Sequence, residues 1–214
     1  MPRHPVDNPR GEGRRIGSVA VVRWDELFAD IEGQLEQELD ASRLDLVAEE
    51  ERLRLGRLGL RDRLVAMSRG GDGVRVTLDG GEQLELRIDS AGRDWVAGEF
   101  RSGELRRAVV VPLAAIVAVL PVGDQLERGL RAPAAEPASD LAGRLGLAFV
   151  LRDLCRRRAP VELTSTDGSH HGTIDRVGRD HLDLAEHEAG DPRRERLVRR
   201  IRIVPLTAIR SVRI

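Results

Sequence analysis

The sequence contains an internal repeat, and this repeat constrains the fold more than any other feature of the chain. The letters GRLGL occur at Gly56–Leu60 and again at Gly143–Leu147. After each copy the same order of patterns follows: a short helical stretch, a strand-like start and an Asp-Gly pair. The copies also end alike, with Val-Pro-Leu-Ala-Ala-Ile at Val111–Ile116 and Val-Pro-Leu-Thr-Ala-Ile at Val204–Ile209. We therefore expect two copies of one module in tandem.

The second copy alternates apolar and polar residues with the period of a β-strand. This alternation is clear at Val161–Thr164 and at His181–Leu184. Asp167-Gly168 is typical of a tight hairpin turn. Pro205 cannot donate a hydrogen bond to a neighbouring strand, so it should end the fourth strand. The pattern predicts one helix and five short strands for each module.

The same patterns divide the chain into five segments. Residues 1–23 contain scattered Pro, Gly and Arg and are expected to form a disordered tail. Residues 24–55 repeat apolar positions at three- and four-residue steps, which predicts a long amphipathic helix. The first module is expected over residues 56–122 and the second over 141–214, and the Pro- and Ala-containing residues 123–140 between them are interpreted as a linker.

Charge is distributed unevenly, although the formal net charge is only −1. The predicted helix 24–55 holds 11 acidic residues against 3 Arg, while residues 143–214 hold 15 Arg against 10 acidic residues. The helix therefore has an acidic solvent face, and its apolar stripe needs a covering surface. A coiled coil with another copy, or a basic protein partner, would supply it.

Several classes of protein are disfavoured. The longest apolar run, Ala108–Val122, contains two prolines and is shorter than the roughly 20 residues of a membrane-spanning helix. The first 23 residues lack the apolar region of a secretory signal. The single Cys155 cannot form an internal disulfide, so a reducing cytoplasm is the expected compartment.

The order of the predicted elements resembles the Sm-like family, which includes the bacterial RNA chaperone Hfq. Val161–Leu184, with a glycine inside its second strand at Gly172, is similar to the first Sm motif, and Ile203–Val212 occupies the place of the second. In the first module Leu86 stands near the place of that strand glycine. The whole chain also resembles a family of uncharacterised proteins from high-GC bacteria that share a run like Trp24–Asp30.

The resemblance implies a fold of the α+β class, mainly β: a long N-terminal helix followed by two tandem Sm-like or SH3-like barrels, each preceded by a short helix. The RNA-reading positions of the family are not kept. Asp183 and Ala97 stand where an Asn is usual, and Leu206-Thr207 replaces a Lys-His pair. Fold alone does not transfer function, so these departures weaken the implied RNA binding.

The Arg residues of the second module are the candidate nucleic-acid interface. Neutralising several phosphates would give a strongly salt-dependent attraction. The alternative is a solvated edge whose Arg residues pair with acidic groups, for example those of helix 24–55. The candidate residues are Arg156, Arg157, Arg158, Arg193, Arg194, Arg196, Arg199, Arg200 and Arg202.

Four histidines fall close together in the second module, among several aspartates: His170, His171, His181 and His187. A metal site is one interpretation, but no paired Cys or helical HxxxH supports it, and turn or strand-surface histidines are the alternative. Motifs of nucleophilic, P-loop and dinucleotide-binding enzymes are missing from the sequence. We expect no catalytic residues, no metal and no cofactor, and therefore a protein that is not an enzyme.

Two hypotheses for function remain. The first is a binding protein that associates with RNA or DNA through the Arg residues named above. The second is a protein-interaction or oligomerisation scaffold, in which the edge strands of the barrels pair with other copies and the acidic helix binds a partner.

Overall fold

The computed structural model describes residues 24–103, 105–132, 141–190 and 193–214. The chain is divided into two compact units, Met1–Glu51 and Arg52–Ile214. The tail that the sequence predicts over residues 1–23, and part of the predicted linker, lie outside the described residues.

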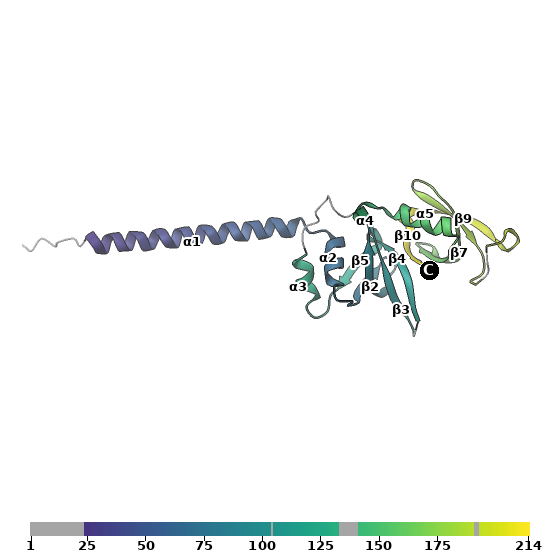
Figure 1. Cartoon of the computed structure of the whole chain (residues 1–214), viewed down its shortest axis with the longest axis horizontal. Helices are drawn as coiled ribbons and strands as arrows, with labels where there is room; N and C mark the ends of the chain where they lie inside the picture. Colours follow the sequence, from purple (N-terminus) through teal and green to yellow (C-terminus); the bar gives the residue numbers. More distant parts are fainter. Residues whose placement is uncertain (1–23, 104, 133–140, 191–192) are drawn as a thin grey trace, which may run out of the picture. The chain divides into compact units, whose positions relative to one another are not determined.

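The described residues of the first unit are helical. Helix α1 (Trp24–Gly56) confirms the long N-terminal helix (Figure 1). Its apolar residues Ile31, Leu35 and Leu39 are each about half exposed. The apolar stripe predicted from the sequence is therefore open within this unit.

The described residues of the second unit contain four further α-helices and three single 3-10 turns. Helices α2 and α5 directly follow the two GRLGL segments, and each begins after a glycine at the N-cap. Both bury one face, through Leu64 and Met67 in α2 and through Leu151 and Leu154 in α5. The helical elements are α2 (Leu60–Met67), η1 (Leu113–Ala115), α3 (Gln125–Leu130), α4 (Leu141–Arg144), α5 (Leu147–Arg157), η2 (Glu195–Leu197) and η3 (Leu206–Ala208).

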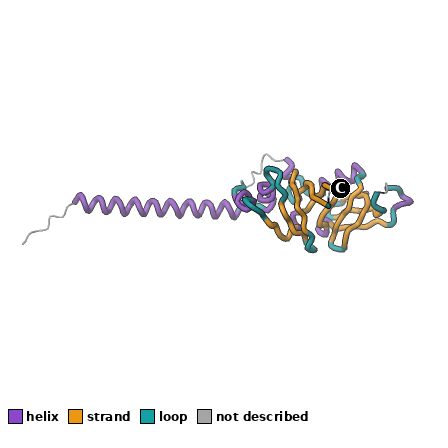
Figure 2. The backbone as a smooth tube through the Cα atoms, turned by 90° about the horizontal axis from the view of Figure 1, so that it is seen from below, coloured by secondary structure: helices purple, strands orange, loops and turns teal. Residues whose placement is uncertain are grey.

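The ten strands of the described residues form one antiparallel sheet that is not closed, in the order β5-β1-β2-β3-β4-β10-β6-β7-β8-β9. Figure 2 shows the strands in orange. The first module contributes β1 (Val74–Leu78), β2 (Gln83–Ala91), β3 (Trp95–Ser102), β4 (Leu105–Pro112) and β5 (Ile116–Leu120). The second module contributes β6 (Pro160–Ser165), β7 (Gly168–Val177), β8 (His181–Glu186), β9 (Arg200–Pro205) and β10 (Ile209–Arg213).

The strand order is the same in both modules. In each, four strands follow one another as a meander and the fifth returns beside the first, so that β5 pairs with β1 and β10 with β6. The α+β class with a long N-terminal helix is confirmed. The predicted arrangement of two separate barrels is not confirmed, because β4 pairs with β10 and the sheet runs on from one module into the other.

Two hydrophobic clusters fill the second unit. One is built from residues of the first module, including Val74, Val76 and Leu78 of β1. The other is built mainly from the second module but also contains Trp95 and Val110 of the first. Buried and less buried residues alternate along β1 and β6, as the period of two predicts. The modules therefore share part of a core as well as a sheet.

Both modules bend their second and third strands at the same place. The register between these strands shifts after Ile88 in the first module and after Ile174 in the second. Each bend brings backbones so close that only glycine fits, since a Cβ on Gly98 would lie 1.8 Å from a carbonyl oxygen of β2 and one on Gly172 2.3 Å from a carbonyl oxygen of β8. In the first module the glycine of the bend is Gly98 on β3 and not a residue of β2, so Leu86 can occupy the β2 position that aligns with Gly172.

Candidate functional site

The nine Arg residues predicted to bind nucleic acid lie on three parts of the second module. Arg156 and Arg157 are in the last turn of α5, and Arg158 ends that helix in a left-handed conformation with φ of 52°. The others lie in the loop before β9, around η2, and along β9 itself: Arg193, Arg194, Arg196, Arg199, Arg200 and Arg202.

Most of these guanidinium groups are paired with carboxylates of the same module. Nε and Nη2 of Arg193 lie 2.9 and 2.6 Å from the two carboxylate oxygens of Asp175, and these hydrogen bonds raise the pKa of Arg193. Arg156 and Arg157 both bind Asp153, at 2.6 and 2.7 Å. Their charges are therefore partly neutralised before any ligand arrives.

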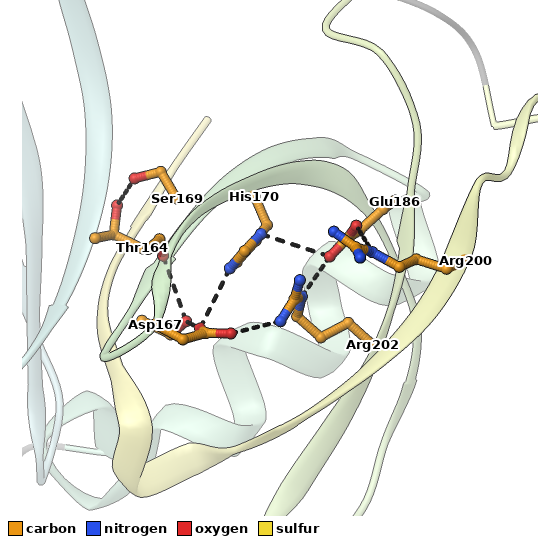
Figure 3. A network of polar contacts seen from close by, with 9 residues as sticks. Thr164, Asp167, Ser169, His170, Glu186, Arg200 and Arg202 are labelled. Carbon is orange, nitrogen blue, oxygen red and sulfur yellow. Dashed lines mark hydrogen bonds and ion pairs between the residues drawn. The ribbon is translucent and has the colours of Figure 1, made fainter.

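Glu186 is the centre of a polar network on β8 and β9 (Figure 3). Its side chain is buried, with 7% of the residue exposed. It accepts hydrogen bonds from Nε of Arg200, at 2.5 Å, and from Nε of Arg202. Burial acts to raise the pKa of Glu186, but the two hydrogen bonds outweigh it, so the pKa lies below its usual value.

Asp167 extends this network on the hairpin turn between β6 and β7. It accepts hydrogen bonds from Ser165, at 2.5 Å, and from Nη1 of Arg202, also at 2.5 Å. His170 lies between the two carboxylates, with Nε2 3.2 Å from Asp167 and Nδ1 3.5 Å from Glu186. The hydrogen bonds from Ser165 and then His170 are the main causes that lower the pKa of Asp167.

These pairings weaken the case for a phosphate-binding surface. A guanidinium that already holds a carboxylate must exchange one anion for another, so it gains less from a phosphate than a free one. Arg199 is also paired, with Glu188. Among the described residues, Arg158, Arg194 and Arg196 are exposed and form no ion pair. The nucleic-acid interface stays a prediction.

Three of the four clustered histidines have side-chain partners within the described part of the chain, and His171 is exposed. His187 is buried and its Nε2 lies 2.9 Å from the hydroxyl of Thr173, while His170 belongs to the network just described. Nδ1 of His181 lies 2.8 Å from Asp180. The described residues contain no group of three or more His, Cys, Asp or Glu side chains placed to hold a metal ion.

The two outermost strands, β5 and β9, are the most distinctive exposed feature of the sheet. Each pairs with only one neighbour among the described strands, so one side of its backbone is open. Both carry exposed apolar side chains, including Leu120 on β5 (41% exposed) and Ile203 on β9 (68% exposed). An open edge with apolar side chains is a template for pairing with another strand.

The joint between the modules shows how such an edge is covered within this chain. Val212 of β10 lies opposite Val110 of β4, and Arg213 lies opposite Val109. Both members of the first pair are buried, at 0% and 4% exposed. The N–H of Ile214 donates to the carbonyl of Ala108 at 3.0 Å and extends the pairing by one residue.

Ion pairs reinforce this joint at both ends of β10. Arg210 binds Asp79 in the first hairpin turn of the first module, at 3.1 Å. Arg213 binds Glu82 of the first module and Glu162 of the second, and its guanidinium lies 5.2 Å from the ring centre of Phe100. The β4 edge of one module and the fifth strand of the other are therefore complementary surfaces.

The repeat gives the paired strand positions of this joint equivalents on the free edges, but Val117 and Leu120 stand at the positions of Arg210 and Arg213, so the ion pairs of the joint have no equivalent there. Aligning Val111–Ile116 with Val204–Ile209 places Ile203 at the position of Val110, and Val119 at the position of Val212. The buried pair of the internal joint thus has exposed or half-buried equivalents on β9 and β5. Sequence reasoning named the edge strands in general but none of these residues, although the alignment of the two repeat ends could have found them.

Comparison of this chain with protein-family models, with curated proteins and with solved structures finds no match. Within the described residues no helix has the length and apolarity to span a membrane. The candidate site therefore rests on the geometry of the sheet edges and of the internal joint.

Proposed function

We propose that this protein is a non-enzymatic assembly protein, built from two Sm-like or SH3-like barrel modules, whose copies join head to tail through β9 of one copy and β5 of the next. The internal β4–β10 joint carries this proposal, because it is the same pairing made between two modules of one chain. Strand addition at an open edge gains backbone hydrogen bonds and buries the side chains beside them.

The repeat fixes the register of the proposed joint. Ile203 of one copy should lie opposite Val119 of the next, and Arg202 opposite Leu120. Within the chain, Val110 lies opposite Val212 and Val109 opposite Arg213 in the same way. Pro121 stands at the position of Ile214 and has no N–H, so one hydrogen bond of the internal joint is not repeated. We expect the joint between copies to be weaker than the joint within the chain.

Such a joint uses two different surfaces, so it is heterologous. A heterologous joint leaves a new free edge after each addition and gives either a closed ring or an open filament. Charged residues on edge strands limit uncontrolled pairing, and β9 carries Arg200 and Arg202 beside its apolar residues. Glu186 binds both in the network of Figure 3, and Asp167 supplies a second carboxylate to Arg202.

Two edge variants of the full chain test this proposal. Ile203→Lys blocks β9 and leaves β5 open, whereas Leu120→Lys blocks β5 and leaves β9 open. Each variant alone should lose the assemblies that the unchanged chain forms, as measured by light scattering over a concentration series. A mixture of the two should restore a single joint, between the β9 edge of Leu120→Lys and the β5 edge of Ile203→Lys.

A matched control is Leu105→Lys, because Leu105 is as exposed as Ile203 but lies at the β3–β4 hairpin. This variant should assemble like the unchanged chain. An unchanged chain that is monomeric at every concentration contradicts the proposal, and so does a mixture that forms no complex.

RNA or DNA binding is the second candidate function. The exposure of Arg158, Arg194 and Arg196 on one module supports it. The acidic helix α1 is a further candidate interaction surface, since its half-exposed Ile31 and Leu35 lie on a helix with many carboxylates.

A further inference from the structure

The internal joint has a second part, at the start of α5. The N–H of Leu147, in the first turn of that helix, donates to the carboxylate of Asp94 at 2.7 Å. The carbonyl of Leu145 accepts two hydrogen bonds, from the N–H of Arg93 at 2.9 Å and from Nε1 of Trp95 at 3.0 Å. The β2–β3 corner of the first module thus caps the N-terminus of the helix of the second.

The second module has a corner with the same backbone. The N–H of Gly178 donates to the carbonyl of His181 at 2.8 Å, as that of Gly92 donates to Trp95 at 2.9 Å. The carbonyl of Asp180 accepts the N–H of Leu206 at 2.8 Å. The carbonyl of Asp94 accepts the N–H of Leu113 in the same way, at 2.9 Å. Asp180 and His181 therefore stand where Asp94 and Trp95 stand in the first module.

The side chains of this second corner are open to solvent. The Asp180 side chain is 84% exposed, whereas Trp95, at the position of His181, is buried in the internal joint. Asp180 accepts a hydrogen bond from Nδ1 of His181, which is the main cause that lowers the pKa of Asp180. A carboxylate has two oxygens, so this bond leaves room for a second donor.

The matching ligand is the start of α2 in the first module. Gly59 caps α2 with φ −80° and ψ 152°, and Gly146 caps α5 with φ −80° and ψ 165°. Leu60 is 40% exposed, whereas its equivalent Leu147 is 6% exposed. The two helix starts have one conformation, but only that of α5 is covered by an Asp and an aromatic residue.

Resting on the proposed head-to-tail assembly, we propose that the Asp180–His181 corner of one copy binds the Leu58–Leu60 segment of the next. The carboxylate of Asp180 accepts the N–H of Leu60. The N–H of Arg179 donates to the carbonyl of Leu58, as that of Arg93 donates to Leu145, and the ring of His181 stands in place of Trp95. Both this contact and the β9–β5 pairing join the second module of one copy to the first module of the next.

The chemistry of the two partners agrees with this contact. Unpaired N–H groups at a helix start favour a carboxylate. The one acidic residue in the first turn, Asp62, is paired with Arg61 at 2.9 Å, which limits its repulsion of Asp180. Gly178 keeps the corner narrow, because a Cβ there would lie 2.6 Å from the His181 ring. Since His181 is smaller than Trp95, the contact should be weaker and more easily reversed than the internal one.

The test compares the dissociation constant of the copy–copy complex in full-length variants. Asp180→Ala removes the acceptor, and the loss of a helix cap predicts association weaker by about tenfold. Asp180→Asn keeps an acceptor oxygen and should restore most of the association. Asp89→Ala removes a carboxylate from an exposed position of β2 and serves as the control. In the unchanged chain, amide exchange at Leu60 should slow as assembly proceeds.

The outcomes separate this inference from the proposed function. If Asp180→Ala assembles like the unchanged chain while Ile203→Lys does not, the edge pairing stands and the corner contact is wrong. If Leu60 exchange is the same in the monomer and in the assembly, the corner contact is also wrong. If the unchanged chain stays monomeric, both the β9–β5 pairing and the corner contact are wrong. Weaker assembly of Asp180→Ala together with recovery in Asp180→Asn supports the corner contact.

Discussion

Replacing Glu186 by glutamine tests whether one buried carboxylate holds the Arg-rich β9 edge in place. The carboxylate accepts hydrogen bonds from Arg200 and Arg202, and hydrogen bonds to a charged group contribute about 1.5–3 kcal/mol each. Glutamine keeps one carbonyl acceptor and so loses about one of these bonds. An amide costs less to bury than a carboxylate, which offsets part of the loss. We expect Glu186→Gln to lower the free energy of unfolding by about 1–2 kcal/mol at pH 7.

The pH dependence of this difference gives a sharper test. The pKa of Glu186 is lower in the folded chain than its usual value, which is about 4.3 in the unfolded chain. Its ionised form therefore stabilises the fold at pH values above the unfolded pKa, and this stabilisation is lost as the pH falls through the folded pKa. The gap between the original chain and Glu186→Gln should be largest near pH 7 and should shrink below about pH 4.

Urea unfolding followed by circular dichroism at several pH values measures this gap. Asp89→Asn, at an exposed position of β2, is the control and should change the free energy of unfolding by less than about 0.5 kcal/mol. A Glu186→Gln variant as stable as the original chain at pH 7 would refute the reasoning, as would a gap that stays constant down to pH 3.

Two further predictions concern the bend of the sheet and the nucleic-acid hypothesis. Gly98→Ala places a Cβ 1.8 Å from a carbonyl oxygen of β2, so the strands must separate, and thermal unfolding should show a loss of several degrees or failure to fold. If the second module binds RNA or DNA, changing three Arg residues to Glu should abolish binding and its dependence on salt in a fluorescence titration, while equal binding by the variant would count against that function. These residues are Arg196, Arg199 and Arg200.

The repeat and the strand pattern made most of the secondary structure predictable. Helix α1, the helices after the two GRLGL segments and the Asp167-Gly168 hairpin all appear where local patterns place them. The joining of the modules was not predictable, because strand pairing between β4 and β10 depends on contacts far apart in sequence. A period of two shows that a strand has a buried face but does not show which strand lies beside it.

Tertiary contacts also changed two local expectations. Helix α3 lies inside the segment interpreted as a linker, where the buried Gln125 donates to the carbonyl of Gly73 at 3.0 Å and accepts the N–H of Val122 at 3.0 Å. The alternation of Leu197, Arg199, Ile201 and Ile203 with the positions between them predicts that the fourth strand of the second module includes Leu197. The strand instead begins at Arg200, because Glu195–Leu197 forms a 3-10 turn before it. The contacts of Gln125 with Gly73 and Val122, and the 3-10 turn before β9, cannot be recognised from residue spacing alone.

The Arg candidates show the same limit. Their clustering in the sequence suggested a free cationic surface, but the partners of Arg193 and Arg202 come from other parts of the same module: Asp175 on β7, Glu186 on β8 and Asp167 on the β6–β7 turn. Composition counts these charges correctly and says nothing about how they are paired.

The β4–β10 pairing joins two modules that belong to one polypeptide. Because the two modules are covalently connected, each experiences the other at an effective concentration of about a millimolar. The internal pairing is therefore formed at any dilution, whereas the proposed pairing between separate molecules would depend on the concentration of the protein. In the proposed assembly, one of the two equivalent joints would be permanent and the other would respond to abundance.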